Sequence, residues 1–462
     1  MMKHTGNRIS EIFLLAFSLL LAFGCKKENL SLNLTGTNRW ILDSMKVYYY
    51  WKDQMPVRPE EQASAGSFFK SLLSPEDRFS FLVNPDEEKK EYSSFAWYGF
   101  EYGLLENKNR SGEFMGVVTL VVPDSPADRN GLKRGDIFTA VNGIPLQQSS
   151  LEQVAKILRL GDGVELALAN LVSGQLIQRE PIKLQYTRHT EQPVYLTRVF
   201  QFGGKKTGYL FYNRFSGDED YQILDSLRML RDQGITELIL DLRYNPGGEV
   251  STTAKIAAVL SNATADQTFV IYQGNSKAGK RISSFQKTIN ENSFPPQSFA
   301  ELLNYRLSLN RVIVLTSSST ASAAELLINN LKPYINVIQI GGTTMGKDMA
   351  SFAIPDFRNP KQVNIVLHPL IFKLYNAQNS GNYQGGLKPD YEIDEFTTLP
   401  LSAFGDPQDP LLKKALEIAG AAAARNTGSA NLNTVSANLK YHSSVIRNQQ
   451  HSHLEVNKIS MP

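Results

Sequence analysis

In the second half of the chain, short apolar runs alternate with glycine-containing turns and helical segments, and this alternation constrains the fold more than any other feature. Three apolar runs, at 237–242, 311–315 and 337–340, each have the length of one buried strand. The first two precede helical segments at 249–260 and about 321–331, and further strands are expected at 349–354 and 363–367. This pattern predicts an α/β domain from Gly208 to about Asp394. A final helix is expected to start at Asp409-Pro410, with Asp409 as its N-cap, and to run to about Ala424.

Two stretches before this domain have different patterns. Residues 38–85 have a helical pattern with a cluster of aromatic side chains, which we interpret as the core of a small helical domain. Residues 97–186 contain short β-rich runs, and Asn142-Gly143 is a strong hairpin signal.

The chain has 462 residues, enough for two or three domains with their own cores. We expect a signal peptide at 1–24, a tether at 25–36, a helical N-terminal domain at 37–96, a β-rich domain at 97–188, an α/β domain at 189–425 and a flexible polar tail at 426–462. The expected fold class is therefore α/β (α+β), with smaller β-rich and helical domains.

The N-terminus has the pattern of an export signal. Lys3, His4 and Arg8 precede a short apolar run, 12–23, which is too short for a comfortable membrane span. Cys25 is the only cysteine and follows this run, where a bacterial lipoprotein signal places the residue that carries the lipid. We therefore expect a lipid anchor at Cys25 and a location in the bacterial cell envelope, facing the periplasm or on the outer-membrane surface. An ordinary signal peptide with an incidental cysteine, or an uncleaved anchor, is the alternative.

Composition narrows the classes of partner and cofactor. A net charge of +3 is too small to argue for nucleic acid, and a single cysteine allows no disulfide within the chain. The six histidines form neither an obvious catalytic set nor a metal-binding pattern with acidic residues. We expect no nucleic-acid partner, no metal and no cofactor.

Ser322 is the first candidate catalytic residue. It lies between an expected strand and an expected helix, where unpaired N–H groups of the first helical turn can bind an oxyanion. The N–H of Ala323 is the natural first donor, and Gly247 or Gly248 could supply a second, because glycine lets the backbone approach a substrate carbonyl closely. A serine at a helix start is more often an N-cap, and spacing alone leaves this alternative open.

Lys347 is the second candidate and follows Ser322 by 347 − 322 = 25 residues. To act as a general base, its amine must be neutral, which requires burial and no nearby carboxylate. Residues 341–346 carry no acid, and Asp348 would point to the opposite face of a strand. A serine beside a buried lysine can do nucleophilic chemistry without histidine.

The chain resembles the C-terminal-processing (tail-specific) serine peptidases over roughly residues 97–395. The resemblance is carried by the segments 240–248, 319–325, 342–347 and 386–390. It implies a crotonase-like ββα catalytic core with a PDZ domain, Ser322 as the nucleophile and Lys347 as the general base. Many members have a glutamine four residues after the lysine that orients it. Here this position is Ser351, so an orienting role for Ser351 is an expectation.

The β-rich domain at 97–188 resembles a PDZ domain through the segments 125–127, 131–136 and 141–143. In that family, backbone N–H groups of a glycine-containing loop bind a peptide's carboxylate, and the peptide adds a strand to the sheet. The resemblance places substrate binding at Gly99, Phe100 and Glu101, with Phe100 in the pocket for the last side chain. The alternative is that Gly99 only forms a turn and Phe100 belongs to the core.

Together these features predict an envelope serine endopeptidase that captures protein or peptide C-termini and cleaves its substrates with Ser322 and Lys347. The rival hypothesis is a catalytically weak or inactive PDZ-containing binding or scaffold lipoprotein, which Ser351 favours. Residues 341–347 formally fit most of a phosphate-binding loop, but Asp348 replaces the Ser/Thr that binds magnesium. We interpret His189 and His368 as structural or surface residues. The pair Asp241 and Arg243 is interpreted as a charge pair that fixes a turn.

Overall fold

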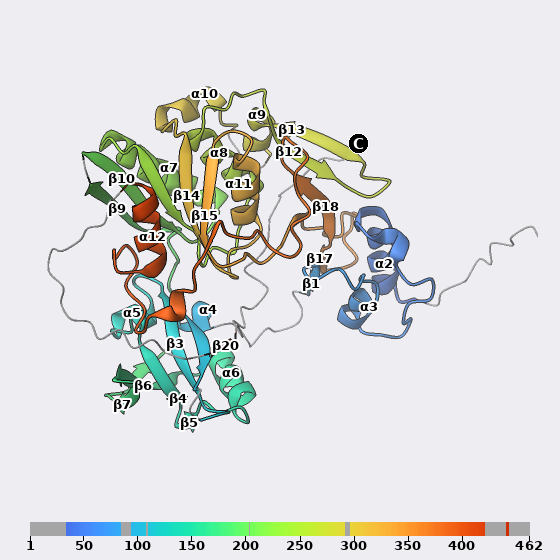
Figure 1. The fold of residues 1–462 in the computed structure, drawn as a ribbon. Coiled ribbons are helices and arrows are strands. Elements are labelled where there is room, and N and C mark those ends of the chain that lie inside the picture. Colours follow the sequence, from blue (N-terminus) through green and yellow to red (C-terminus); the bar gives the residue numbers. More distant parts are fainter. Residues whose placement is uncertain are drawn as a thin grey trace, which may run out of the picture.

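The computed structural model describes residues 34–84, 94–107, 110–202, 204–291 and 296–420, and the backbone of 440–442. The expected signal peptide, the lipidation site Cys25, the first part of the tether and most of the expected tail lie outside these residues. Two smaller lobes flank an α/β domain (Figure 1). Among the described residues, no helix combines the length and apolar character needed to cross a membrane.

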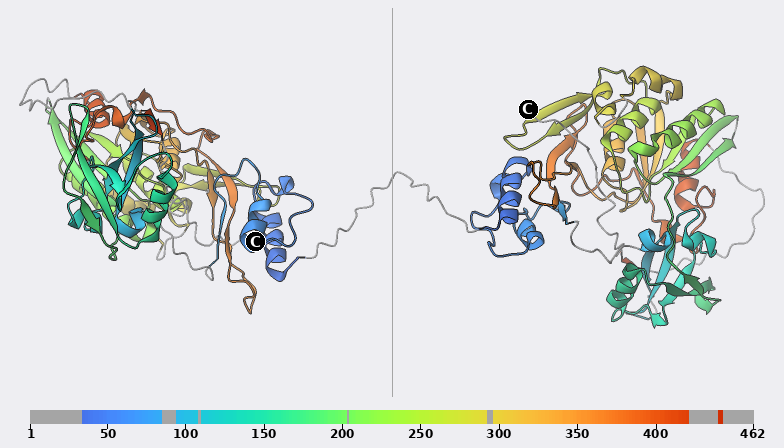
Figure 2. Two further views of the ribbon diagram at one scale, coloured as in Figure 1. Left: turned by 90° about the horizontal axis from the view of Figure 1, so that it is seen from below. Right: turned by 180° about the vertical axis from the view of Figure 1, so that it is seen from behind.

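Residues 34–84 form the N-terminal lobe, which has the helical character predicted from the sequence. Its elements are α2 (Gly36–Tyr48), η1 (Lys52–Gln54), α3 (Ala65–Ser71) and the short strand β1 (Phe81–Val83). Thr35 and Ser64 cap the two α-helices through their side chains. The buried apolar residues of both helices belong to the same hydrophobic cluster as the α/β domain. The aromatic side chains thus pack in or against a core, as predicted, but this core is shared with the α/β domain and does not belong to the lobe alone. The lobe is thus docked on the α/β domain (Figure 2).

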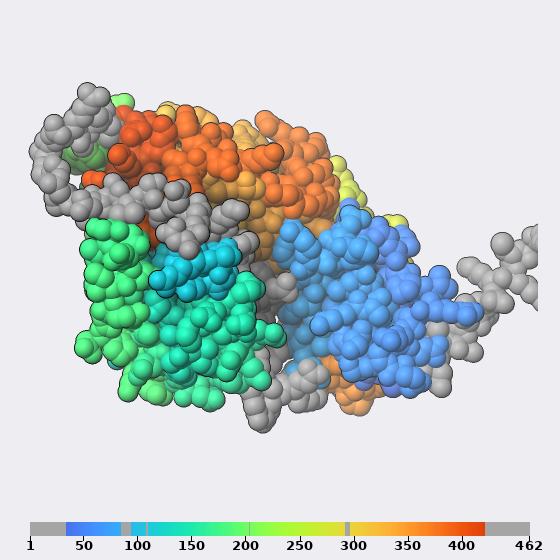
Figure 3. All heavy atoms as spheres, turned by 60° about the horizontal axis from the view of Figure 1, so that its bottom comes forward, coloured from blue at the N-terminus to red at the C-terminus, as the bar shows by residue number. Residues whose placement is uncertain are grey.

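The second lobe is built around a sheet with the strand order β20-β2-β3-β4-β6-β7. Its strands are β2 (Phe100–Glu106), β3 (Phe114–Val121), β4 (Ile137–Val141), β5 (Ile144–Pro145), β6 (Val164–Val172), β7 (Gln175–Gln178), β8 (Ile182–Leu184) and β20 (Lys440–His442). Its helices are α4 (Ser94–Tyr98), α5 (Pro126–Arg129) and α6 (Leu151–Leu160). Asn142 and Gly143 both have positive φ, which confirms the predicted hairpin turn. This lobe has its own hydrophobic core. Its elements are separate from those of the N-terminal lobe (Figure 1), and both lobes lie on the face of the molecule seen in Figure 3.

The α/β domain contains a six-stranded sheet with the order β19-β15-β14-β11-β10-β9, in which only β9 is antiparallel to its neighbour. The strands are β9 (Val194–Phe202), β10 (Lys205–Tyr212), β11 (Glu237–Asp241), β14 (Arg311–Thr316), β15 (Asn336–Gly341) and β19 (Tyr391–Glu392). The major helices are α7 (Asp220–Asp232), α8 (Val250–Leu260), α11 (Ala323–Leu331) and α12 (Pro410–Ile418). The three strands predicted from apolar runs are confirmed. Asp409 caps α12 as predicted, although the helix ends at Ile418.

Alternating side chains of this sheet enter two different cores. Leu238 and Leu240 pack with α7, α8 and α11, whereas Ile239 lies in the cluster that contains α12. Short elements complete the connections: η2 (Gly217–Glu219), α9 (Phe285–Ile289), α10 (Phe299–Leu302), η3 (Leu303–Tyr305) and η4 (Glu395–Thr397).

A second sheet has the order β13-β12-β18-β16, and β1 pairs with β17. These strands are β12 (Thr268–Gln273), β13 (Lys280–Ser284), β16 (Met349–Ser351), β17 (Val366–His368) and β18 (Leu370–Tyr375). The strands predicted at 349–354 and 363–367 are therefore shorter than expected. The carboxylate of Asp356 accepts hydrogen bonds from the N–H groups of Arg358, Gln362 and Val363, which turns this segment into a loop.

Candidate active site

Ser322 lies between β14 and α11, at the N-cap position of the helix, and is 1% exposed. Its φ of 59° is one that non-glycine residues rarely adopt, so the surrounding structure must hold it. The carbonyl of Asn245 accepts the N–H of Ala321 at 3.0 Å, which fixes the turn before the serine. Among the described residues, Ser322 Oγ has no hydrogen-bond partner. The hydroxyl therefore does not cap the helix.

Glu325 connects Ser322 to the lysine loop. Its carboxylate is fully buried and accepts the backbone N–H groups of Ser322 at 2.8 Å and Lys347 at 2.8 Å on the same oxygen, Oε2. Its other oxygen accepts the Thr344 hydroxyl at 2.5 Å and the Gly346 N–H at 2.6 Å. Burial raises the pKa of Glu325, and these four donors oppose that shift. One side chain thus holds both candidate catalytic residues by their backbones.

Lys347 is buried, with 2% exposure, as a general base requires. Burial lowers the pKa of Lys347 to about 8, although the charges of Glu325 and Asp77 act in the opposite direction. The expectation that no carboxylate lies near the amine is therefore wrong. Glu325 and Asp77 are far from Lys347 in the sequence, so the residues next to the lysine did not indicate them. At this pKa, about a tenth of the amine is neutral at pH 7.

The hydroxyl of Ser322 and the amine of Lys347 do not hydrogen bond to each other. Catalytic hydrogen bonds are often long or poorly aligned before substrate binds. The structure brings the two residues to one site and fixes their backbones. The hydrogen bond between the Ser322 hydroxyl and the Lys347 amine would form when substrate binds.

The neighbours of Lys347 in sequence lie on or beside β16. Asp348 forms an ion pair with Lys373, with 3.8 Å between Asp348 Oδ2 and Lys373 Nζ. Its carboxylate therefore pairs with Lys373 and not with Lys347, in line with the prediction that it points to the opposite face of the strand. Ser351 is buried at the end of β16. Its role in orienting the amine remains a prediction.

The two alternatives for the second oxyanion donor differ in the structure. Gly247 already donates its N–H to Asn245 Oδ1 at 2.8 Å, so this N–H is committed to the turn. Gly248 and Ala323 donate their N–H groups to no acceptor among the described residues. A Cβ on Gly247 would lie 2.7 Å from Ser322 Cβ and 2.8 Å from Ala323 N. Gly247 thus keeps the space next to the Ala323 N–H open. Because the N–H of Gly247 is bonded to Asn245, Gly248 is a better candidate than Gly247 for the second N–H donor to the oxyanion.

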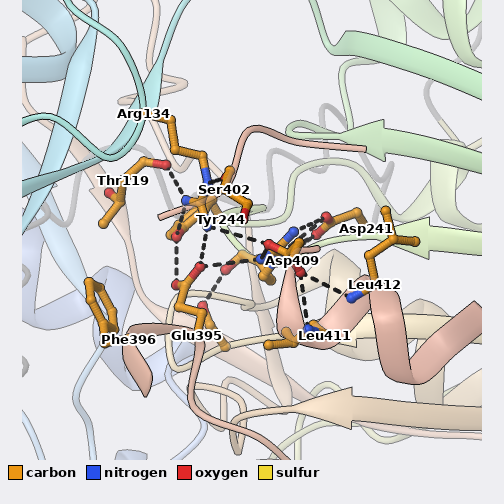
Figure 4. A network of polar contacts seen from close by, with 12 residues as sticks. Thr119, Arg134, Asp241, Tyr244, Glu395, Phe396, Ser402, Asp409, Leu411 and Leu412 are labelled. Atoms are coloured by element: carbon orange, nitrogen blue, oxygen red, sulfur yellow. Dashed lines mark hydrogen bonds and ion pairs between the residues drawn. The ribbon is translucent and has the colours of Figure 1, made fainter. Parts of the chain in front are cut away.

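A buried ionic network lies behind this turn (Figure 4). Arg243 binds Asp241 at 2.7 Å, which confirms the predicted charge pair, and it also binds Asp409 at 2.7 Å. From the second lobe, Arg134 reaches Glu395 at 2.7 Å and the hydroxyl of Tyr244 at 2.8 Å. The side chains of these residues are at most 7% exposed. The network joins the second lobe, the glycine turn and the C-terminal helix.

The predicted peptide-binding loop at 98–101 is not an open carboxylate site. Gly99 donates its N–H to the carbonyls of Ser94 at 3.1 Å and Phe95 at 3.0 Å, and Phe100 is fully buried in the core of the lobe. The assignment of Gly99 and Phe100 to substrate binding is therefore wrong for this structure, because α4 binds the N–H of Gly99 and the Phe100 side chain is packed in the core. Glu101 instead lines a cavity of about 280 Å³ between the two domains, opposite Ser317–Ser319 and Gly341–Thr343.

Sequence reasoning also missed several neighbours of Lys347. Glu325 follows Ser322 in an S-x-x-E pattern, which is a capping-box signal and could have indicated the contact. Phe79 lies with its ring centroid 5.5 Å from Lys347 Nζ. His368 is buried against Phe81, with stacked rings 4.2 Å apart, and burial and Lys347 lower its pKa to about 4. A neutral, stacked histidine fits the structural role that we expected for it.

Within the described ranges, no group of three or more His, Cys, Asp or Glu side chains is arranged to hold a metal ion.

Comparisons with known proteins match three parts of the chain. The model of peptidase family S41 matches residues 206–393, the S41 N-terminal domain matches 36–81, and a PDZ domain matches 117–169. A carboxyl-terminal-processing protease from Picosynechococcus is 26% identical over 309 residues, which are 66% of this chain and 68% of that protein. The chloroplastic carboxyl-terminal-processing peptidase 1 of Arabidopsis thaliana is 24% identical over 343 residues, or 74% of this chain and 65% of that protein. The chain thus spans about two thirds of these relatives.

Among solved structures, a protein described as an S41 protease from Bacteroides fragilis is 26% identical, with a TM-score of 0.67. The match covers 82% of this chain and 97% of that one. The expected architecture of an α/β catalytic core with a PDZ domain and a small helical N-terminal region is therefore confirmed.

Proposed function

Since this chain belongs to peptidase family S41, a family of serine peptidases, and carries a PDZ domain, we propose that it cleaves proteins or peptides with a Ser322–Lys347 dyad. One observation carries this proposal. Glu325 Oε2 binds the backbone N–H groups of both Ser322 and Lys347, so the two residues share one buried anchor.

In the first half of the reaction, Ser322 Oγ attacks the carbonyl carbon of the scissile peptide bond, and its proton passes to neutral Lys347 Nζ. The negative charge that develops on the carbonyl oxygen is bound by the N–H groups of Ala323 and Gly248, next to the N-terminus of α11. The C–N bond then breaks, and the leaving amine takes the proton from the Lys347 ammonium. An ester on Ser322 remains.

In the second half, a water molecule attacks the ester carbonyl and gives a proton to Lys347 Nζ. When the ester bond breaks, the proton on Lys347 returns to Ser322 Oγ, and the carboxylic acid leaves. Both halves need the neutral amine, so the buried position of Lys347 supports the same role in each.

Capture of substrate C-termini by the PDZ domain is the second part of the proposal. The relatives in the comparison are named for carboxyl-terminal processing, and PDZ domains add peptides to a sheet edge. In this chain a peptide would add beside β2, on the side where residues 104–106 pair with β20 in the structure.

We also propose an envelope location with a lipid anchor at Cys25. The basic residues before the apolar run at 12–23 and the cysteine two positions after it support this location. A Cys25→Ser variant expressed in a bacterial host is expected to incorporate no labelled fatty acid. Equal incorporation in this variant and the parent protein would exclude the anchor.

Digestion of casein and of a peptide with a free C-terminus tests the proposed activity. We expect cleavage by the parent protein, no cleavage by Ser322→Ala and at least a 100-fold loss with Lys347→Ala, with unchanged circular dichroism in both variants. Amidation of the peptide's C-terminus should raise its KM. Binding without cleavage by the parent protein would instead select the scaffold alternative.

A further inference from the structure

We propose that Arg78 and Phe79 of the N-terminal lobe are positioning residues for Lys347, and that the active site is incomplete without this lobe. The proposal rests on the proposed dyad and adds residues from a region that the sequence treats as a separate helical domain. In many related peptidases, a glutamine at the position of Ser351 orients the catalytic lysine. The proposal gives this function to Arg78 and Phe79.

Arg78 binds the loop that carries the lysine. One of its terminal nitrogens, Nη2, donates to the carbonyl oxygens of Gly346 at 3.1 Å and Met345 at 3.3 Å. The same nitrogen donates to Gln384 O at 2.9 Å, on a second loop. A guanidinium that bridges two loops at the residue directly before Lys347 restrains the direction of the lysine side chain.

Phe79 covers the amine itself. Its ring centroid lies 5.5 Å from Lys347 Nζ, and the guanidinium carbon of Arg78 lies 4.7 Å from the same ring. The ring keeps water from the amine, and burial is the largest cause of the lowered pKa of Lys347. A ring face also attracts an ammonium, but this attraction is weak at such a distance compared with the loss of hydration.

The segment that carries both residues is fixed to the catalytic domain at several points. Asp77 Oδ1 accepts the N–H groups of Phe79 at 3.0 Å and Ser80 at 2.9 Å, which forms a tight turn. Ser80 Oγ accepts the N–H of Leu370 at 2.8 Å, and β1 pairs with β17. These contacts fix the position of the lobe relative to the lysine loop, and a residue that positions Lys347 needs such a fixed support.

The charged and titratable groups around the amine come from three parts of the structure. Glu325 belongs to α11, Asp77 and Arg78 to the N-terminal lobe, and His368 to β17. Substitution of Phe79 alters none of these charges. A change in the titration of Lys347 in a Phe79 variant would therefore report the loss of water exclusion.

The test measures the pKa of Lys347 in two independent ways. The pH dependence of kcat/KM reports it through activity, and competitive labelling with acetic anhydride, followed by peptide mass spectrometry, reports it without any cleavage. In Phe79→Ala we expect the pKa to rise from about 8 toward the ordinary 10.5, so both midpoints should move to higher pH by about one unit or more. At pH 7, kcat should fall about tenfold per unit.

Arg78→Ala should lower kcat about tenfold or more with little change in KM. Arg78→Lys should restore part of kcat, because an ammonium can donate to some of the same carbonyl oxygens without the planar geometry of the guanidinium. The matched controls are Phe357→Ala, at a phenylalanine that is 72% exposed, and Arg58→Ala, at an exposed arginine of the same lobe. Both controls should leave kcat and the two midpoints unchanged.

The proposal is overturned if Phe79→Ala is folded and both midpoints stay where they are. If Phe79→Ala does not fold, Phe79→Gln decides, because it keeps a long side chain but places a polar group beside the amine. An unchanged labelling midpoint in that variant also overturns the proposal. If the parent protein cleaves nothing, the proposed function fails, while the labelling midpoints still test the position of Phe79.

Discussion

The backbone of Ser322 must leave β14 and enter α11 within a turn that also presents the reacting hydroxyl. Its positive φ is sustained because its N–H binds Glu325 and the preceding residue, Ala321, binds Asn245. A serine that capped its own helix would have its hydroxyl occupied. Here Glu325 satisfies the backbone instead, and the hydroxyl stays available for attack on a carbonyl carbon.

Gly247→Ala tests the space before the oxyanion donors. Gly247 has a φ of +103°, and a Cβ there would lie 2.7 Å from Ser322 Cβ and 2.8 Å from Ala323 N. We expect kcat to fall about 100- to 1,000-fold, the effect of losing an oxyanion donor, with a stability loss of about 1–3 kcal/mol from backbone strain. Kinetic assays and urea unfolding measure the two effects.

Gly385→Ala is the matched control for Gly247→Ala, because no heavy atom lies within 4 Å of its added Cβ and its φ is not positive. It should retain parental kcat. Parental activity in Gly247→Ala would mean that the carbonyl oxygen of the substrate does not occupy this space.

At the residue scale, the sequence was sufficient to select Ser322 and Lys347 but not their supports. Glu325 lies in the predicted motif, yet three of its four hydrogen bonds come from a loop more than fifteen residues away in the chain. Gly99 and Phe100 were misassigned for a similar reason. A glycine before a strand fits both a carboxylate loop and a helix terminus, and α4 decides between them.

Among the elements, the parallel strands were the most predictable, because buried strands need continuous apolar runs. The strands β16 and β17 were less predictable, because the polar side chain of Asp356 takes backbone donors that a longer strand would use. The pairing of β1 with β17 joins residues 81–83 to 366–368. Local sequence patterns cannot predict a contact between segments so far apart in the chain.

The strand β20 leads to a prediction about the PDZ domain. Its residues 440–442 pair antiparallel with Leu104–Glu106 of β2, the edge at which a captured peptide would add. A variant that ends at Gly420 should therefore bind peptides with a free C-terminus several-fold more tightly, because no segment of the chain competes for this edge. Fluorescence anisotropy with a labelled peptide measures the Kd.

The comparison for this prediction is a full-length variant with Tyr441→Pro. Proline has no N–H for a sheet ladder, so this variant should resemble the truncated one. If neither change alters the Kd, the tail does not compete with peptides for β2.

At the scale of the whole molecule, Arg134 links the PDZ domain to the catalytic domain. It is 6% exposed by side chain and lies between Glu395, Tyr244 and the carbonyl of Ser402. Arg134→Met would leave buried carboxylates with less positive charge. We expect it to lower the free energy of unfolding at pH 7 by about 3–5 kcal/mol, as measured by urea unfolding.

The loss should depend on pH. Burial acts to raise the pKa of Asp409, but Arg243 and Arg134 outweigh burial and hold this pKa below its usual value. A lowered pKa contributes stability that is complete above the unfolded value of about 3.9 and is lost as the pH falls through the folded value. The effect of Arg134→Met should therefore be smaller at pH 2 than at pH 7.

Arg179→Met provides the control, because Arg179 is in the same domain, pairs with Asp136 at 2.8 Å and is 35% exposed. An exposed pair contributes only about 0–1 kcal/mol. Equal losses in the two variants would show that the buried network does not stabilise the contact between the domains.

The N-terminal lobe changes the description of the molecule as a chain of separate units. Composition and periodicity predicted its helices, yet its buried residues share one cluster with the catalytic domain. Through Arg78 and Phe79 it also reaches the lysine loop. Sequence patterns report local periodicity, whereas this docking depends on contacts between segments more than 260 residues apart.

Formation of an ester on Ser322 is the most direct test of the dyad. The parent protein is mixed at pH 8 with the 4-nitrophenyl ester of a blocked amino acid and analysed by intact mass and peptide mass spectrometry. We predict a mass increase of one acyl group on the peptide that contains Ser322, no increase in Ser322→Ala and a strongly reduced rate in Lys347→Ala. Acylation at an equal rate in all three proteins would contradict the account.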